Sequence, residues 1–89
     1  MKINGKTFKP TRGRCLLELQ DNDDVMSRTE EVSNWMKVIA IGEPLDIKPE
    51  FNVGDTVYMA IIKGKQVIGD DGDRYLVTHI SAIDMVPND

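Results

Sequence analysis

Apolar and β-branched residues recur along this chain in short runs, and none of the runs has the period of an amphipathic helix. Clusters of Gly, Pro, Asn and Asp separate the runs and favour turns. The pattern predicts strands at residues 14–19, 35–41, 56–62, 66–68, 74–80 and 82–86. Short strands with turns at intervals of about 8 to 12 residues are typical of small barrels and sandwiches. We therefore expect an all-β fold, either a small barrel or a sandwich.

The segments between these runs carry their own signals. Residues 43–50 contain two prolines, which cannot donate to a strand ladder, so we expect a surface crossover there. Residues 69–73 contain an Asp-Gly step, which predicts a hairpin between the strands on either side. Residues 35–41 are almost continuously apolar, which is typical of a strand buried on both faces.

Residues 20–34 interrupt the strand pattern. The segment contains five acidic residues and one basic residue, a local charge of -4, and has no apolar period. Its only apolar residues are Val25, Met26 and Val32. We expect a long mobile loop between the first two main strands, because so few apolar side chains cannot offset the entropy of ordering the backbone. The alternative is a short helix over residues 25–32 with Asp24 as its N-cap.

Composition and charge limit the classes of protein. The 89 residues (10.0 kDa) have room for one domain, residues 1–89, and 40% hydrophobic content predicts that it folds. With five aromatic residues the core is thin, which favours self-association. The net charge of -4 disfavours nucleic acid as the main partner. Residues 1–14 hold five basic residues and no acid, so a nucleic-acid-binding arm is a minor alternative to a lead into a strand.

Residues for catalysis or metal binding are scarce. Cys15 is the only cysteine and His79 the only histidine, which together cannot complete a zinc site. A single cysteine and the lack of a long apolar run predict a reducing compartment and no membrane span, hence a cytoplasmic protein. Gly64-Lys65 lacks the remaining positions of a phosphate loop, and the acidic clusters lack those of a calcium loop. We expect no enzymatic activity, no cofactor and no metal.

The order of the segments resembles that of the GroES-like co-chaperonins, and the resemblance covers residues 8–86. Residues 9–18, with Pro10 and Arg14, resemble the family's opening strand, and residues 35–42 resemble the strand after its mobile loop. Val53-Gly54-Asp55-Thr56-Val57 is similar to its "VGDxV" turn, and residues 75–86 to its closing segment.

This resemblance implies a small irregular β-barrel, with the mobile loop between its first two main strands, that assembles into a heptameric lid. In the family, mobile loops dock on a large GroEL-like chaperonin in its nucleotide-bound state, the lid closes a chamber for an unfolded client, and the partner hydrolyses ATP. The loop here lacks the family's Gly-Gly-Ile-Val-Leu tag, and the 43–52 crossover is short. Both departures resemble phage-encoded co-chaperonins, which implies a capsid protein as client and the host cytoplasm as location.

Two sets of contact residues follow from the resemblance. The chaperonin contact would be made by Val25 and Met26, with Val32 contributing less. For the ring, we expect the first and last strands to leave unpaired edges that join neighbouring subunits, which places Arg14 and Leu16 against Ile83 and Met85. The alternative from another class is a small all-β structural protein, such as a phage virion component.

Overall fold

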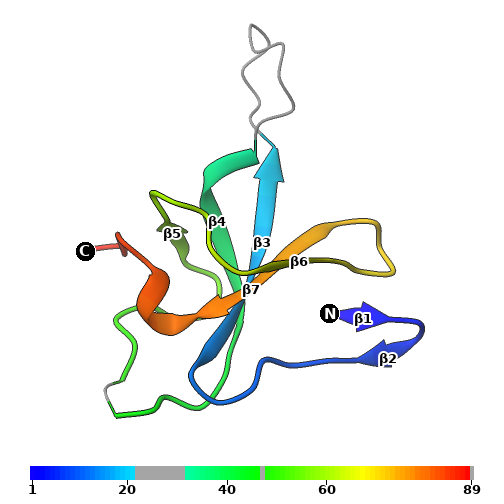
Figure 1. Ribbon diagram of the computed structural model, residues 1–89, viewed down its shortest axis with the longest axis horizontal. Coiled ribbons are helices and arrows are strands. Elements are labelled where there is room, and N and C mark those ends of the chain that lie inside the picture. The colour runs from blue at the N-terminus through cyan, green and yellow to red at the C-terminus, as the bar shows by residue number, and fades with distance from the viewer. Residues whose placement is uncertain (22–31, 47, 89) are drawn as a thin grey trace, which may run out of the picture.

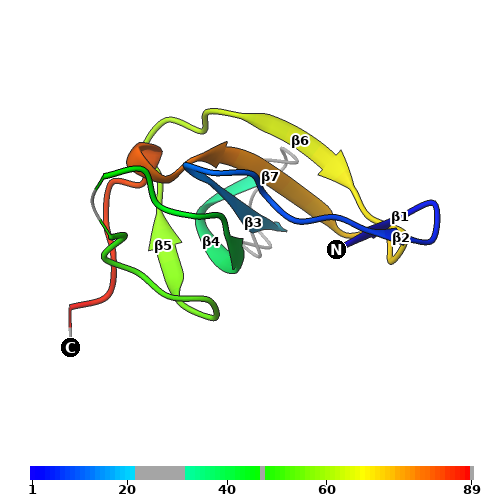
Figure 2. The same ribbon diagram turned by 90° about the horizontal axis from the view of Figure 1, so that it is seen from below.

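The computed structural model of the protein describes residues 1–21, 32–46 and 48–88. Five antiparallel strands form one sheet in the order β5-β4-β3-β7-β6, and a two-stranded hairpin lies beside it (Figures 1 and 2). The elements are β1 (Lys2–Ile3), β2 (Lys6–Thr7), β3 (Arg14–Asp21), β4 (Val32–Ile41), β5 (Thr56–Tyr58), β6 (Lys65–Ile68), β7 (Arg74–His79) and a 3₁₀ turn, η1 (Ile80–Ala82).

The all-β prediction is confirmed, but closure into a barrel is not present. Among the described residues, β5 and β6 are the two outer strands of the sheet and do not pair with each other. The predicted strands at 14–19 and 35–41 correspond to β3 and β4, and residues 69–73 join β6 to β7 as a hairpin. The hairpin is closed by the Gly69 N–H, which donates to the Asp73 carbonyl at 3.0 Å.

Strand β3 occupies the centre of the sheet, paired with β4 on one side and β7 on the other. The prediction that residues 14–19 form an unpaired edge is therefore wrong. Two long antiparallel neighbours satisfy the backbone of β3 within the chain, since β7 returns through the β6–β7 hairpin to lie beside it. The free outer edge of the sheet on this side belongs to β6.

A one-residue shift of register in β4 explains its continuous apolar run. Leu16 pairs with Ala40, but Leu17 pairs with Val38, so Ile39 is an extra residue in the ladder. An extra residue reverses which face the following side chains occupy. Met36 and Val38 face the core before the shift, and Ile41 packs against the same core after it. The expected burial of both faces of residues 35–41 is thus incorrect, because Lys37 is exposed and Trp35 is 47% exposed.

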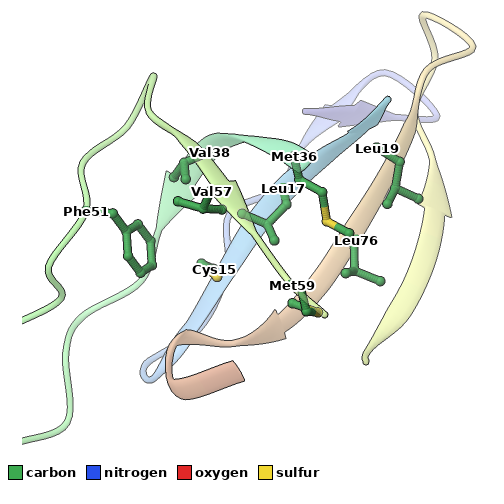
Figure 3. Close-up of a cluster of buried hydrophobic side chains, with 9 residues drawn as sticks. All are labelled: Cys15, Leu17, Leu19, Met36, Val38, Phe51, Val57, Met59 and Leu76. Carbon is green, nitrogen blue, oxygen red and sulfur yellow. The ribbon is translucent and has the colours of Figure 1, made fainter. Parts of the chain in front are cut away.

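One face of the sheet carries the core (Figure 3). Alternate residues of β3 meet residues of β4, β5 and β7, and Phe51 of the crossover covers one end. The cluster contains Cys15, Leu17, Leu19, Met36, Val38, Phe51, Val57, Met59 and Leu76. Side chains from Ile80 to Val86 pack against this cluster at its border. Burial of apolar surface at about 25 cal/mol per Å² is the main stabilising contribution of this layer.

The N-terminal hairpin lies at one end of the sheet (Figure 2). Asn4 and Gly5 form its turn with φ of 53° and 78°, the left-handed pair that an Asn-Gly step favours. The Asp70 carboxylate accepts the N–H groups of both residues at 2.8 Å, and the Asp70 N–H donates to the Lys2 carbonyl at 2.8 Å. The β1–β2 hairpin is thereby attached to the tip of the β6–β7 hairpin.

Two predicted strands are shorter or absent. Strand β5 ends at Tyr58, because the backbone beyond it takes other partners: the Asp84 carboxylate accepts the Ala60 N–H at 2.7 Å, and the Met59 sulfur accepts the Lys63 N–H at 3.2 Å. The prediction of a strand at 82–86 is also wrong. The chain turns through η1 and makes one antiparallel bridge, between Tyr58 and Met85.

Candidate functional site

The described residues on either side of the predicted loop are paired with each other. Asp21, the last residue of β3, pairs with Val32, the first residue of β4, so the two strands lie side by side at this end of the sheet (Figure 1). Val25 and Met26 lie outside the described residues, as do the side chain of Val32 and the alternative 25–32 helix. The predicted mobility of residues 20–34 accordingly remains a prediction.

The base of this loop is bonded to the segment that follows β5. Between Leu19 and Asp21 the first strand advances two residues, while β4 advances four, from Met36 to Val32. Asn34 lies in this irregular stretch, and its side-chain amide donates to the carbonyl oxygens of Met59 at 2.8 Å and Ala60 at 3.1 Å. The backbone N–H of Met59 in turn donates to the Asn34 carbonyl at 3.1 Å. These bonds hold the base of the loop in place.

Next to this base, two exposed side chains and one half-buried side chain form a row over β4, β5 and the C-terminal segment, on the face opposite the core. Trp35 pairs with Tyr58, and Tyr58 bridges to Met85, so the three residues lie side by side on adjacent segments. The Trp35 and Tyr58 rings have centroids 4.9 Å apart and an interplanar angle of 58°. Trp35 and Met85 are each 47% exposed. The row Trp35, Tyr58 and Met85 forms an apolar surface beside the loop.

The structure separates the four residues expected at the ring contact. Arg14 is exposed at the start of β3, but Leu16 is 2% exposed and lines a pocket together with Ile3 and Phe8 of the N-terminal segment. Leu16 is thus covered by its own chain. Ile83 is half-buried, whereas Met85 belongs to the exposed row. Of the four, Arg14 and Met85 present side chains that a second copy can reach.

A groove of about 400 Å³ runs between the crossover and the C-terminal segment. Apolar side chains form much of its lining: Leu45, Phe51, Ile80, Ile83 and Val86. Sequence reasoning did not identify this groove or the role of Tyr58 in the exposed row. Neither has a local signal, because each is assembled from segments that are distant in the sequence.

In the described part of the chain, the only thiol and the only imidazole lie on opposite faces of the sheet. Burial raises the pKa of the Cys15 thiol to about 11, and this side chain packs in the core. His79 is exposed and pairs with Arg14, the residue before Cys15, so it lies toward the other face of the sheet. Among residues 1–21, 32–46 and 48–88, no cluster of three or more His, Cys, Asp or Glu residues could hold a metal ion.

Comparison with known proteins adds no assignment. No helix within the described part of the chain is long and apolar enough to cross a membrane. The sequence matches no protein-family model and no curated protein at a significant level.

Proposed function

We propose that this protein is a co-chaperonin, a ring-shaped lid that caps a large ATP-dependent chaperonin and assists the folding of a client protein. The proposal rests on the resemblance of residues 9–18, 35–42, 53–57 and 75–86 to GroES-like co-chaperonins. The observation that carries it is the pairing of Asp21 with Val32. This pairing brings the two longest strands, β3 and β4, together on either side of residues 22–31, the part of the sequence that contains Val25 and Met26.

The "VGD" turn supports the same proposal. The Val38 N–H donates to the Asp55 carbonyl and the Gly54 N–H donates to the Val38 carbonyl, both at 2.8 Å. The Asp55 carboxylate also accepts the Asn52 N–H at 2.8 Å, which closes the turn. Residues 52–55 are therefore docked on β4, the strand that returns from the loop. Two of the segments that carry the resemblance are in direct contact.

A single Val25-Met26 contact would be weak. Burying both side chains in a partner groove supplies about 3 to 6 kcal/mol. Ordering about five loop residues costs about 5 to 10 kcal/mol. Useful affinity then requires several loops of one ring to engage together, because linked contacts raise avidity by orders of magnitude. The proposed function thus depends on both the loop and the oligomer.

The test is nucleotide-dependent capture by a double-ring chaperonin. Mixed with the chaperonin and ATP or ADP, the protein should co-elute with it in size-exclusion chromatography and give bullet-shaped particles in negative stain. The double substitution Val25→Ser with Met26→Ser should reduce capture at least about a hundredfold. Val32→Ser should have a much smaller effect.

The matched control is Val53→Ser with Ile61→Ser, which removes two apolar side chains that are 61% and 69% exposed outside the loop. The chaperonin should capture this variant with the same affinity as the wild type. Undiminished capture of the Val25/Met26 variant would instead place the contact elsewhere, with Trp35 the next residue to replace. A complete lack of nucleotide-dependent capture would exclude the lid and favour a structural all-β protein.

A further inference from the structure

Basic residues from three distant parts of the chain meet at one pocket. Arg14 begins β3, Lys63 and Lys65 flank the entry to β6, and His79 ends β7. All four line a pocket of about 420 Å³, together with Gly64 and Ser81. The chain has a net charge of -4, but no Asp or Glu lines this pocket. Within the described residues, its positive charges have no neighbouring carboxylate in the lining.

The fold itself creates this convergence. Arg14 and His79 are direct cross-strand partners, which places their side chains on the same face of the sheet. Lys65 pairs with Val77, two residues from His79 on the same strand. Gly64 has φ of 125° and approaches β7 so closely that a Cβ there would overlap the Val77 carbonyl oxygen. This close approach carries Lys63 and Lys65 to the end of β7.

The groups in the pocket are mainly hydrogen-bond donors. A guanidinium and two ammonium groups donate without accepting, and the Ser81 hydroxyl and the His79 ring add further donors. A phosphate group has close to two negative charges and several acceptor oxygens, so it can accept from several of these donors at once. A single carboxylate has one charge and two oxygens. The density of positive charge favours phosphate over an acidic protein segment.

We propose that this pocket is a binding site for phosphate groups. The site is independent of the chaperonin contact, because none of its lining residues belongs to the 20–34 loop. Arg14, Lys63, Lys65, His79 and Ser81 are all exposed, so the site exchanges its ligand readily and its affinity falls as ionic strength rises.

The experiment is an amide NMR titration of the full chain with inorganic pyrophosphate at constant ionic strength. The amide signals of Gly64, Thr78, His79 and Ser81 should shift and saturate, whereas those of the hairpin tip at 69–73 should not. Lys63→Gln with Lys65→Gln should raise the dissociation constant by roughly fivefold to twentyfold. The matched control is Lys2→Gln with Lys6→Gln, which removes the same charge outside the pocket lining and should change it less than about twofold.

Further titrations separate the possible sources of the phosphate. If pyrophosphate or ATP binds and oligothymidylate does not displace it, the ligand is a small phosphorylated molecule. Tighter binding of oligothymidylate, with a steep dependence on salt, indicates a nucleic-acid backbone. The proposal is overturned if pyrophosphate gives no saturable shift, if both double variants weaken binding equally, or if polyglutamate binds at this pocket more tightly than pyrophosphate.

Discussion

At the scale of single residues, the Tyr75–Asp71 hydrogen bond supports the β6–β7 turn. The Tyr75 hydroxyl donates to Asp71 Oδ2 at 2.7 Å, and Asp71 Oδ1 accepts the Asp73 N–H at 3.0 Å. The Tyr75 hydrogen bond and then the Asp73 N–H hold the pKa of Asp71 below its ordinary value of 3.8. The same hydrogen bond, together with burial, raises the pKa of Tyr75 from 10.0 to about 12.

These opposite pKa shifts predict two pH windows for the stability that this bond contributes. A lowered carboxyl pKa gives stability that is present above pH 3.8 and is lost as pH falls through the folded-state value. A raised phenol pKa gives stability that is complete below pH 10 and is lost as pH rises through about 12. Tyr75→Phe should therefore reduce the loss of unfolding free energy between pH 10 and about pH 12, measured by urea unfolding at a series of pH values.

The same variant should move the Asp71 pKa up toward 3.8 in a carboxyl NMR titration, because the first cause of its lowering is removed. Tyr58→Phe is the matched control and should leave the Asp71 titration unchanged, since Tyr58 lies on β5, beyond β4 and β3 from this hairpin. An unchanged Asp71 pKa in Tyr75→Phe would contradict the assigned hydrogen bond.

At the scale of an element, β4 contains one residue more than its pairing with β3 requires. Deletion of Ile39 would remove the extra residue and leave Leu16 paired with Ala40 and Leu17 with Val38, so Met36, Val38 and Ile41 would still face the core. The variant would lose the half-buried Ile39 side chain and the local bend of the bulge, at a cost of about 1 to 2 kcal/mol. The deletion variant should therefore remain folded at 25 °C by circular dichroism.

The control for this prediction is Ile39→Ala, which keeps the register. Ile39 is only half-buried, so this variant should lose about 1 to 2 kcal/mol and remain folded. An unfolded deletion variant beside a folded Ile39→Ala variant would contradict this assignment of Ile39 as the extra residue of the ladder.

At the scale of the whole molecule, the open sheet predicts that copies of the chain associate. Edge strands are usually paired or protected, yet β6 ends the sheet, and residues 83–88 make a single bridge to Tyr58. When one edge of a subunit contacts a different edge of the next subunit, the contact is heterologous. Such subunits assemble into a closed ring or into an open filament. Under the proposed function, native mass spectrometry at micromolar concentration should detect a heptamer. A strictly monomeric species would contradict the ring.

One substitution tests whether the C-terminal segment takes part in that assembly. Met85→Asp places a charge in the exposed row without entering the core, and should raise the concentration at which the ring dissociates at least about tenfold. Ile61→Asp is the control, because Ile61 is 69% exposed and lies outside the row. Equal assembly of both variants would exclude Met85 from the interface.

The sequence alone determined the class of the fold and several of its elements. Strands β3 and β4, the β6–β7 hairpin and the strand-free crossover follow from side-chain alternation, turn residues and prolines, all of which act over a few neighbouring positions. The Asn4-Gly5 step was an equally local signal for the β1–β2 hairpin, and its omission from the predicted elements was a failure of interpretation. The charge of residues 20–34 and their lack of an apolar period predict a loop, which lies largely outside the described residues and stays a prediction.

The tertiary structure alone decided which strands lie at the edges and which side chains share a surface. Strand β3 is central because β4 and β7 both pair with it. Strand β5 ends at Tyr58, and two residues later the Asp84 carboxylate accepts the Ala60 N–H. The row of Trp35, Tyr58 and Met85 and the basic pocket each join residues far apart in the chain. Such arrangements depend on long-range pairing, which no short window of sequence encodes.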